Sequence, residues 1–319
     1  NNTPLDNTSN EETAAINNIG VHIVGHKGHL IGTASEDGYG TIWGCNVGVE
    51  IGTVAISKQS NSDNDRPEPN LGESNVSHVQ SVACNSGFRI HNDGNYITKS
   101  KAACGKYELN PADDLARLQS SDGFVVGIKA LIEGRGCDIG TTSVRSVSQN
   151  TLFDTQAIGN NNGYIGGNEL EIKRESPIFN LLTNHIKESL ADQNSGDGFL
   201  IEGTGFILKS NAATRNSGTG INYSRLNPAC GPQEGVVNLF DGNTATYNQT
   251  YGVASTFSLK SDKNQGGFFK NNYASENAQY SYFEANSECA TGESNLNLYN
   301  LWKENGPKDA TNNEACTLD

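Results

Sequence analysis

The sequence predicts an all-β fold, a right-handed parallel β-helix (a solenoid) in which the chain winds through stacked coils of short strands. A glycine-led pattern recurs along the chain, which is typical of a solenoid. Hydrophobic residues make up 34% of the 319 residues, and the mean hydropathy is −0.54. So few apolar residues suit the thin core of a solenoid better than that of a compact sphere. The 36 glycines and the many asparagines fit a fold with many tight bends, because both residues tolerate positive φ.

The repeat is clearest in residues 195–201 and 217–223, which read Ser-Gly-Asp-Gly-Phe-Leu-Ile and Ser-Gly-Thr-Gly-Ile-Asn-Tyr. Their offset of 22 residues matches one β-helix coil. A β-sandwich is the alternative, but a sandwich would not repeat glycine and apolar positions in the same phase. Similar starts occur at Gly20, Gly48, Gly87 and Gly123, with weaker ones at Gly163 and Gly267.

The alternation after each glycine places two side chains inward and one outward. Equivalent residues of neighbouring coils then lie about 4.8 Å apart and form ladders. The first inward ladder is expected to comprise Val21, Val49, Phe88, Phe124, Phe199 and Ile221, and the second Ile23, Ile51, Ile90, Val126 and Ile201. Second strands within the coils are expected at 29–31, 53–56, 130–132 and 206–208.

The β-helix is predicted over residues 20–288, with an N-terminal extension or cap at 1–19 and a C-terminal cap or tail at 289–319. Polar insertions are expected at 58–75 and 104–118. One short helix is expected over 176–193, because Ser176 and Pro177 suit a helix start and apolar residues from Ile178 to Leu190 recur at helical spacing.

The net charge of −14 argues against a nucleic-acid partner, and no apolar run is long enough for a membrane span. The chain begins at Asn1 and contains no methionine, which favours the mature form of an exported protein. Asn-x-Ser/Thr sequons arise by chance in so asparagine-rich a chain, so each stands open between a glycan and none. The glycosylation candidates are Asn7, Asn75, Asn222 and Asn248.

The seven cysteines include no Cys-x-x-Cys pair, and their wide spacing in an exported chain favours disulfides. Cys84 with Cys104, and Cys289 with Cys316, are the favoured pairs, because each would close one coil-sized insertion. The sequence leaves the connectivity open. Since seven is odd, one thiol is free or pairs between molecules.

Residues 195–223 closely, and 20–223 loosely, resemble the parallel β-helix repeat of the pectate-lyase-like superfamily. Polysaccharide lyases, glycoside hydrolases, epimerases, tailspikes and surface proteins share that repeat, so the resemblance implies the fold and leaves the function open. The polygalacturonase combination of Asn-Thr-Asp, Asp-Asp and Gly-His-Gly does not occur, nor does the pectate-lyase pattern Trp-Ile-Asp-His. Their absence favours a protein without catalytic activity.

The outward position of the first strand would align His22, Glu50 and Arg89 on three consecutive coils, with His91 two residues further. A carboxylate between histidine and arginine suits acid–base chemistry on a charged sugar. The alternative is a surface ladder of alternating charge, which stacking favours in any case.

No metal or cofactor is expected. Histidines 22, 26 and 29 are close in sequence, but they fall on a strand and on a turn, so convergence on zinc is not expected. Calcium is the one ion for which an oxygen-rich segment exists, at residues 61–65.

Two functions follow. The first is an extracellular or cell-surface structural or adhesive protein, with self-assembly into a homopolymer, as in a filament, sheath or surface layer. The second is an enzyme acting on an acidic polysaccharide, either a lyase or a hydrolase.

Overall fold

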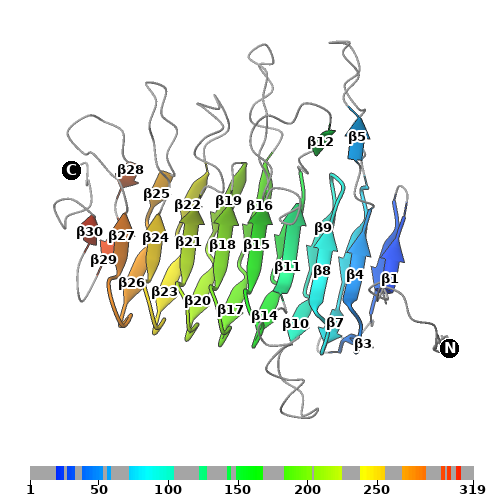
Figure 1. Ribbon diagram of the computed structural model, residues 1–319, viewed down its shortest axis with the longest axis horizontal. Coiled ribbons are helices and arrows are strands. Elements are labelled where there is room, and N and C mark those ends of the chain that lie inside the picture. Colours follow the sequence, from blue (N-terminus) through cyan, green and yellow to red (C-terminus); the bar gives the residue numbers. More distant parts are fainter. Residues whose placement is uncertain are drawn as a thin grey trace, which may run out of the picture.

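The computed structural model confirms the predicted right-handed parallel β-helix (Figure 1). Each coil contributes one strand to each of three parallel sheets, named here sheets A, B and C in the order in which the chain visits them. The structure describes residues 19–24, 27–32, 38–52, 56–58, 72–103, 122–127, 142–144, 149–167, 183–202, 205–224, 238–255, 268–284, 296–298, 300–302 and 307–309.

Strands of each sheet lie in coil order, so every neighbour in a sheet belongs to the next coil. Sheet A contains β1 (Ile19–Ile23), β4 (Val47–Ile51), β8 (Ser86–Ile90), β11 (Asp122–Gly127), β15 (Tyr164–Gly167), β18 (Phe199–Glu202), β21 (Ile221–Ser224), β24 (Val253–Ser255), β27 (Tyr282–Glu284) and β30 (Pro307–Asp309). Sheet B contains β2 (His29–Ile31), β6 (Asn75–Ser77), β9 (Tyr96–Thr98), β13 (Thr151–Phe153), β16 (Asn184–Lys187), β19 (Phe206–Lys209), β22 (Leu239–Asp241), β25 (Phe268–Lys270) and β28 (Leu296–Leu298). Sheet C contains β3 (Gly40–Trp43), β7 (Val79–Val82), β10 (Lys101–Ala103), β14 (Gln156–Ile158), β17 (Leu190–Asp192), β20 (Ala212–Thr214), β23 (Thr244–Thr246), β26 (Tyr273–Ser275) and β29 (Leu301–Trp302).

The two predicted inward ladders run along sheet A. Register pairs Val21 with Val49, Phe88 and Phe124 in turn, and the same column continues to Tyr282. Sheets B and C complete the core with ladders of their own. The inward residues of both ladders are at most 1% exposed. Those of sheet B are Val76, Ile97, Leu152, Ile186, Leu208, Phe240 and Phe269, and those of sheet C are Ala102, Ala157, Ala191, Ala213, Ala245 and Ala274.

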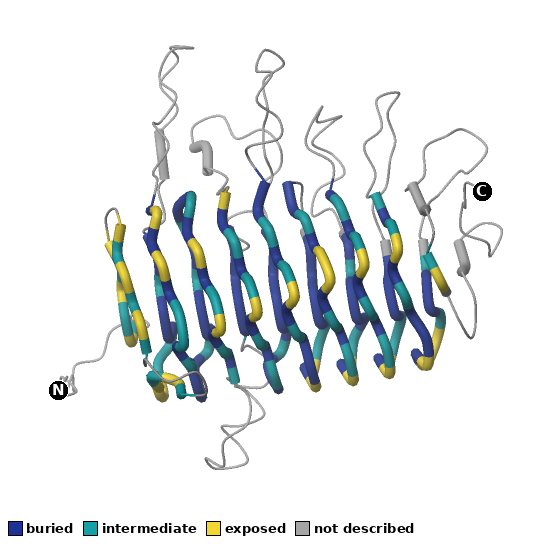
Figure 2. The backbone as a smooth tube through the Cα atoms, turned by 180° about the vertical axis from the view of Figure 1, so that it is seen from behind, coloured by how far each residue is buried: buried dark blue, intermediate teal, exposed yellow. Residues whose placement is uncertain are grey.

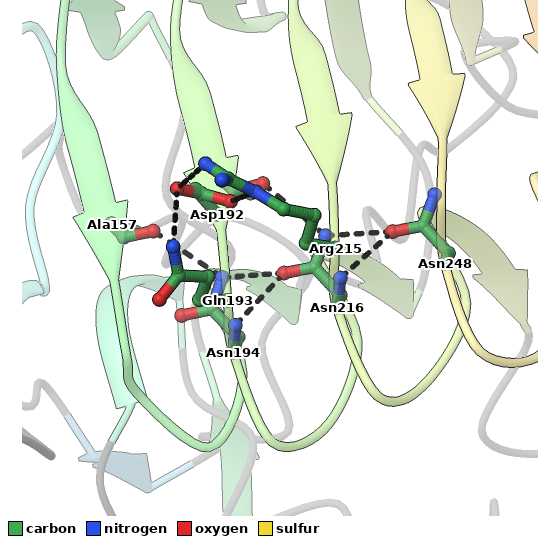
Figure 3. A network of polar contacts seen from close by, with 8 residues as sticks. Ala157, Asp192, Gln193, Asn194, Arg215, Asn216 and Asn248 are labelled. Carbon is green, nitrogen blue, oxygen red and sulfur yellow. Dashed lines mark hydrogen bonds and ion pairs between the residues drawn. The ribbon is translucent and has the colours of Figure 1, made fainter.

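The corners of the coils carry buried side-chain ladders. At the corner from sheet C to sheet A, a residue with positive φ is followed by a buried asparagine, as in Gln193-Asn194 and Arg215-Asn216 (Figure 3). Each asparagine accepts hydrogen bonds through Oδ1 from the backbone and side chain of its predecessor one coil earlier. This C–A ladder comprises Asn160, Asn194, Asn216, Asn248 and Asn277.

The other two corners repeat the device. The B–C ladder runs through Ser189, Asn211, Asn243, Asn272 and Asn300, and the A–B ladder includes Asn95, Asn150 and Asn184. Many of the asparagines that the structure describes therefore serve as buried ladder residues. The expectation that asparagines supply positive φ is wrong for most of those described, since Asn271 is the one asparagine among them with a positive φ.

The glycine that opens each repeat is required by close packing. A Cβ on Gly198 would lie 2.5 Å from the carbonyl oxygen of Gly220 and 2.9 Å from Asn216 Nδ2. Gly123, Gly163, Gly220 and Gly252 face equivalent contacts on their own neighbouring coils. The repeat signature thus marks a place where consecutive coils touch backbone to backbone.

We expect Gly198→Ala to destabilise the protein by about 2 kcal/mol, because overpacking at a rigid backbone contact costs roughly 1–3 kcal/mol. Urea unfolding followed by circular dichroism measures the change. Gly44→Ala is the control, since a Cβ there meets nothing within 4 Å although φ is +69°. That control should lose only about 1 kcal/mol of stability, which is the strain of an alanine in the left-handed region. A Gly198→Ala loss no larger than the control's would contradict the contact.

The predicted helix over 176–193 is wrong where the structure describes that segment. Residues 184–187 and 190–192 form β16 and β17, and Glu188 between them has a φ of 50°, which no α-helix accommodates. Ile186 points into the core and Leu190 outward, so their spacing of four residues reflects two strands across a corner. Residues 168–182 lie outside the described part.

Most of the predicted insertions fall outside the described residues, as do the strand expected at 130–132 and all but the last residue of the strand expected at 53–56. Strands β5 (Ile56–Lys58) and β12 (Thr142–Val144) form a separate antiparallel pair. The second strands expected at 29–31 and 206–208 are confirmed as β2 and β19. Stacking continues past residue 288, because β28, β29 and β30 each pair in parallel with the preceding coil.

Candidate functional site

The structure brings the predicted charged column together on the outer face of sheet A. Register pairs His22 of β1 with Glu50 of β4, and Glu50 with Arg89 of β8. Successive side chains of a strand point to opposite faces of the sheet. The two apolar neighbours of each of these residues point inward, so the charged side chain between them points outward. His91 directly follows β8, and its backbone N–H donates to Ile51 O. We name His22, Glu50, Arg89 and His91 the charged cluster.

Glu50 is the centre of the charged cluster. Its Oε1 lies 3.1 Å from His91 Nε2, and its Oε2 lies 3.9 Å from His22 Nε2. Only 15% of the Glu50 side chain and 7% of the His91 side chain are exposed. His22 Nε2 is also 3.0 Å from Gly52 O, and Arg89 Nε donates to Ser86 Oγ at 3.1 Å. A buried carboxylate held between two imidazoles is more than a solvated surface ladder requires.

Burial lowers the pKa of His91, and this outweighs the opposing effect of Glu50. The geometry gives the reason. Nε2 faces the carboxylate and donates the ring's one proton, whereas Nδ1 is buried with no hydrogen-bond partner among the described residues. A second proton on Nδ1 would therefore be a buried donor without an acceptor. His91 is neutral at pH 7 and its bare Nδ1 is an acceptor.

The arrangement has parts suited to acid–base chemistry. Glu50 offers a carboxylate that can exchange a proton, whereas Nδ1 of His91 is buried and poorly placed to do so. The neighbouring arginine supplies positive charge for an anionic ligand. Beyond Arg89 the outward column becomes apolar, with Val125, Ile165 and Leu200 packed together. The charged cluster is therefore confined to the first three coils.

We expect the free energy of unfolding to fall as the pH drops from 7 towards 5. Burial lowers the pKa of both His91 and His185, so below their ordinary value of 6.5 the unfolded chain binds more protons than the folded one. Denaturant titrations at several pH values should show this loss, and His91→Gln should make it shallower. The exposed His29→Gln is the control and keeps the wild-type slope. Equal slopes for both variants would contradict a buried neutral His91.

Zinc and calcium gain no support here. His29 lies on β2 of sheet B, away from His22 on sheet A, and His26 lies outside the described residues, as does the oxygen-rich segment 61–65. Among the residues that the structure describes, no three His, Cys, Asp or Glu side chains gather as metal ligands. The described part likewise holds no helix long and apolar enough to cross a membrane.

The glycosylation candidates differ in access. Asn75 is exposed on β6, and Asn222 Nδ2 donates to Asp197 Oδ2 at 2.8 Å. Asn248 is 1% exposed, and its Nδ2 donates within the C–A ladder. Asn75 is thus the sequon whose amide the folded chain presents to solvent, while Asn7 lies outside the described part.

Two of the seven cysteines, Cys45 and Cys84, lie among the described residues. Cys84 is buried, and the backbone N–H of Cys45 on the preceding coil donates to its Sγ at 3.4 Å. The predicted partner Cys104 lies outside the described residues, as do Cys289 and Cys316. The two predicted cysteine pairs therefore stay predictions.

The exposed residues of the first coil are a feature that sequence reasoning did not identify. Strands β1, β2 and β3 are the terminal strands of the three sheets. Figure 2 shows the coil that they form in exposed and half-buried colours, whereas the following coils are buried within. Val24 is 68% exposed and Ile31 66%, and Tyr39 and Trp43 are exposed on the same coil. Four apolar residues outside the repeat phase, all before Gly44, were the available signal.

Comparisons with protein-family models, with curated proteins and with solved structures find no match to this chain.

Proposed function

We propose that this chain is an extracellular or cell-surface structural protein of the pectate-lyase-like superfamily, a stiff rod that assembles head to tail into a homopolymer. The observation that carries the proposal is the first coil, where each of the three sheets has its terminal described strand and four large apolar side chains are exposed. Natural β-proteins usually protect such edges, since they invite strand addition. An adhesive role is compatible with the same rod.

The occupant of the first coil is a second copy of the chain. The opposite terminal strands of the same three sheets are β28 and β29 of the last complete coil and β30, which follows it. Head-to-tail contact would keep each new strand pair parallel, as is every pair between consecutive coils of the three sheets. A heterologous contact of this kind leaves both outer ends open and so propagates as a filament.

The first coil also has apolar surface to bury. Its inward residues Ile23, Leu30 and Ile42 are only half buried, whereas the equivalent Ile51 and Val76 of the second coil are fully buried. One more coil on the open side would complete their burial, at about 25 cal/mol for each Å² of apolar surface. The net charge of −14 opposes this association, so salt should promote it.

Sedimentation velocity over a range of protein concentrations tests the proposal. The wild-type chain should form species larger than a monomer, and Ile31→Lys should shift it to the monomer because a charge on an edge strand opposes pairing. Tyr247→Lys is the matched control, an apolar residue 54% exposed at a corner remote from both ends. It should assemble as the wild type does. A wild-type chain that stays monomeric at every concentration and salt would exclude the proposal.

The charged cluster supports a second candidate, acid–base chemistry on an acidic polysaccharide. Its specific observation is the 3.1 Å contact of the buried Glu50 with neutral His91, one register position from Arg89. A screen of uronate polymers for new reducing ends or unsaturated products tests it. Glu50→Gln should abolish turnover, and Glu73→Gln, whose exposed carboxylate contacts only Lys27 among the described ion pairs, should retain it. No turnover of any polymer by the wild type would remove this candidate.

A further inference from the structure

Cys45 and Cys84 occupy ladder positions of the corner from sheet C to sheet A. Each follows a residue with positive φ, Gly44 at 69° and Ala83 at 52°, as Asn216 follows Arg215 further along. The pairings Trp43 with Val82 and Val47 with Ser86 flank them, so Cys45 and Cys84 lie opposite each other on consecutive coils. The two cysteines stand where the later coils place asparagines.

Their contacts repeat those of the asparagine ladder. The backbone N–H of Cys45 donates to Cys84 Sγ at 3.4 Å, as the backbone N–H of Asn194 donates to Asn216 Oδ1 at 3.1 Å. Each thiol also donates to the carbonyl oxygen two residues before it, at 3.5 Å for Cys45 and 3.3 Å for Cys84. Both side chains therefore make equivalent contacts at equivalent positions of consecutive coils.

We propose that Cys45 and Cys84 form a disulfide that joins the first two coils once the chain is in an oxidising environment. Neighbouring strands are about 4.8 Å apart, which falls within the span of about 4.4–6.8 Å between Cα atoms that disulfides accept. The backbone bond from Asn85 N–H to Cys45 O at 3.1 Å holds the two coils at that spacing. The disulfide is independent of assembly and of any activity.

The exchange balances with a small disulfide such as oxidised glutathione. The half-buried Cys45 loses its proton and attacks one sulfur of the oxidant, releasing one glutathione thiol and leaving a mixed disulfide. Cys84, also deprotonated, then attacks the Cys45 sulfur and releases the second glutathione thiol. Two protein thiols are oxidised, one oxidant disulfide is reduced, and the two protons end on the two glutathiones. Burial, and next the adjacent Cys84, raise the pKa of Cys45, so the first step is slow at neutral pH.

The consequence is local. Among the described strands, those of the first coil have a neighbour on one side only, and the two cysteines are 39 residues apart in the sequence. A covalent link there restricts the separation of the end coil, which is the part of a solenoid most prone to fray. At the corner between the first two coils, the disulfide would link the coils covalently where later coils are linked by asparagine hydrogen bonds.

Peptide mapping of the folded, glutathione-oxidised chain tests the proposal. After free thiols are blocked with iodoacetamide, trypsin releases Cys45 in peptide 28–58 and Cys84 in peptide 59–89, each as the sole cysteine. The expected product is the two peptides joined and lighter by two hydrogen atoms. Peptide 59–89 joined to 102–106, which carries Cys104, would overturn the proposal. So would both peptides recovered alkylated, or carrying glutathione alone.

Hydrogen exchange gives a second readout. Oxidation should slow exchange in β1 by on the order of tenfold, because opening of the end coil then costs more. Cys45→Ser, which keeps a small polar side chain at the corner, should exchange at the reduced wild-type rate with or without oxidant. An equal response to oxidant in the wild type and in Cys45→Ser would show that other cysteines cause the change and would overturn the proposal.

Discussion

Replacing Phe124 with alanine should destabilise the chain by about 4 kcal/mol, because truncation of a buried phenylalanine costs roughly 3–5 kcal/mol. Phe124 is fully buried, and its ring stacks on Phe88 at 4.5 Å and on Tyr164 at 5.1 Å between centroids. The alanine leaves a cavity that consecutive coils cannot close, since their spacing is fixed by backbone hydrogen bonds in all three sheets. Urea unfolding measured by circular dichroism reports the loss.

Tyr96→Ala is the matched control for the aromatic ladder. Tyr96 lies on β9 and is 42% exposed, so its loss should cost less than 1 kcal/mol. Phe124→Leu should fall between the two, because it keeps most of the volume but loses both ring stacks. A Phe124→Ala protein as stable as Tyr96→Ala would show that the predicted inward ladder does not carry the core.

Asn216→Ala should cost about 3 kcal/mol or more, since each buried polar group left unpaired costs roughly 1–3 kcal/mol. Asn216 is fully buried, and its Oδ1 accepts from Asn194 N–H and Nδ2. Its Nδ2 donates to Ala191 O at 3.2 Å and to Asn248 Oδ1 at 2.9 Å. Figure 3 shows the side chain between its two ladder neighbours. Alanine removes all four bonds, and calorimetry or urea unfolding measures the result.

Asn216→Asp separates hydrogen bonding from shape. The carboxylate would be buried opposite Asn248 Oδ1 and Ala191 O, two acceptors that disfavour the charged form. The variant should therefore be at least as unstable as Asn216→Ala at pH 7 and recover part of the loss near pH 4, where a protonated oxygen can donate. The exposed Asn75→Ala is the control and should be near neutral. If Asn216→Ala lowered the free energy of unfolding by less than two ordinary surface substitutions do together, the asparagine ladder could not be a source of stability.

The sequence predicted the fold because the recurring glycine and the apolar alternation that follows it repeat with the same period. Apolar alternation after each glycine determined which side chains of sheet A point inward, and register pairs Val49, Phe88 and Phe124 as expected. The charged column followed from the same phase, since His22, Glu50 and Arg89 occupy the outward position between inward residues. What the period could not give was burial of Glu50 and His91, which depends on how neighbouring coils cover that face.

The sequence misled where one spacing fits two structures. Ile186 and Leu190 are four residues apart, as on a helix, yet they lie on two strands that meet at the corner residue Glu188. The asparagine ladders were missed because asparagine was interpreted through its tolerance of positive φ. Asn194 and Asn216 each stand four residues before the glycine of a repeat, Gly198 and Gly220, so the clearest pair of repeats begins one residue earlier than the pattern used to find it.

The exposed residues of the end coil were missed for a different reason. A repeat describes what every coil shares, whereas an end differs from the other coils by having a neighbour on one side only. The exposure of Val24 and Ile31, and the terminal place of β1 in sheet A, become visible only when the coils are stacked. For the same reason the Cys45–Cys84 contact could not be predicted from the sizes of the insertions.

Electron cryomicroscopy of the purified chain across a series of concentrations tests the central claim, a rod that stacks head to tail through its first coil. The account predicts particles of constant width whose lengths are multiples of one unit. Ten strands in sheet A make that unit about 48 Å long, at about 4.8 Å for each coil. The 4.8 Å repeat should continue without interruption across each junction. Particles of a single unit length at every concentration, or units joined side by side, would contradict it.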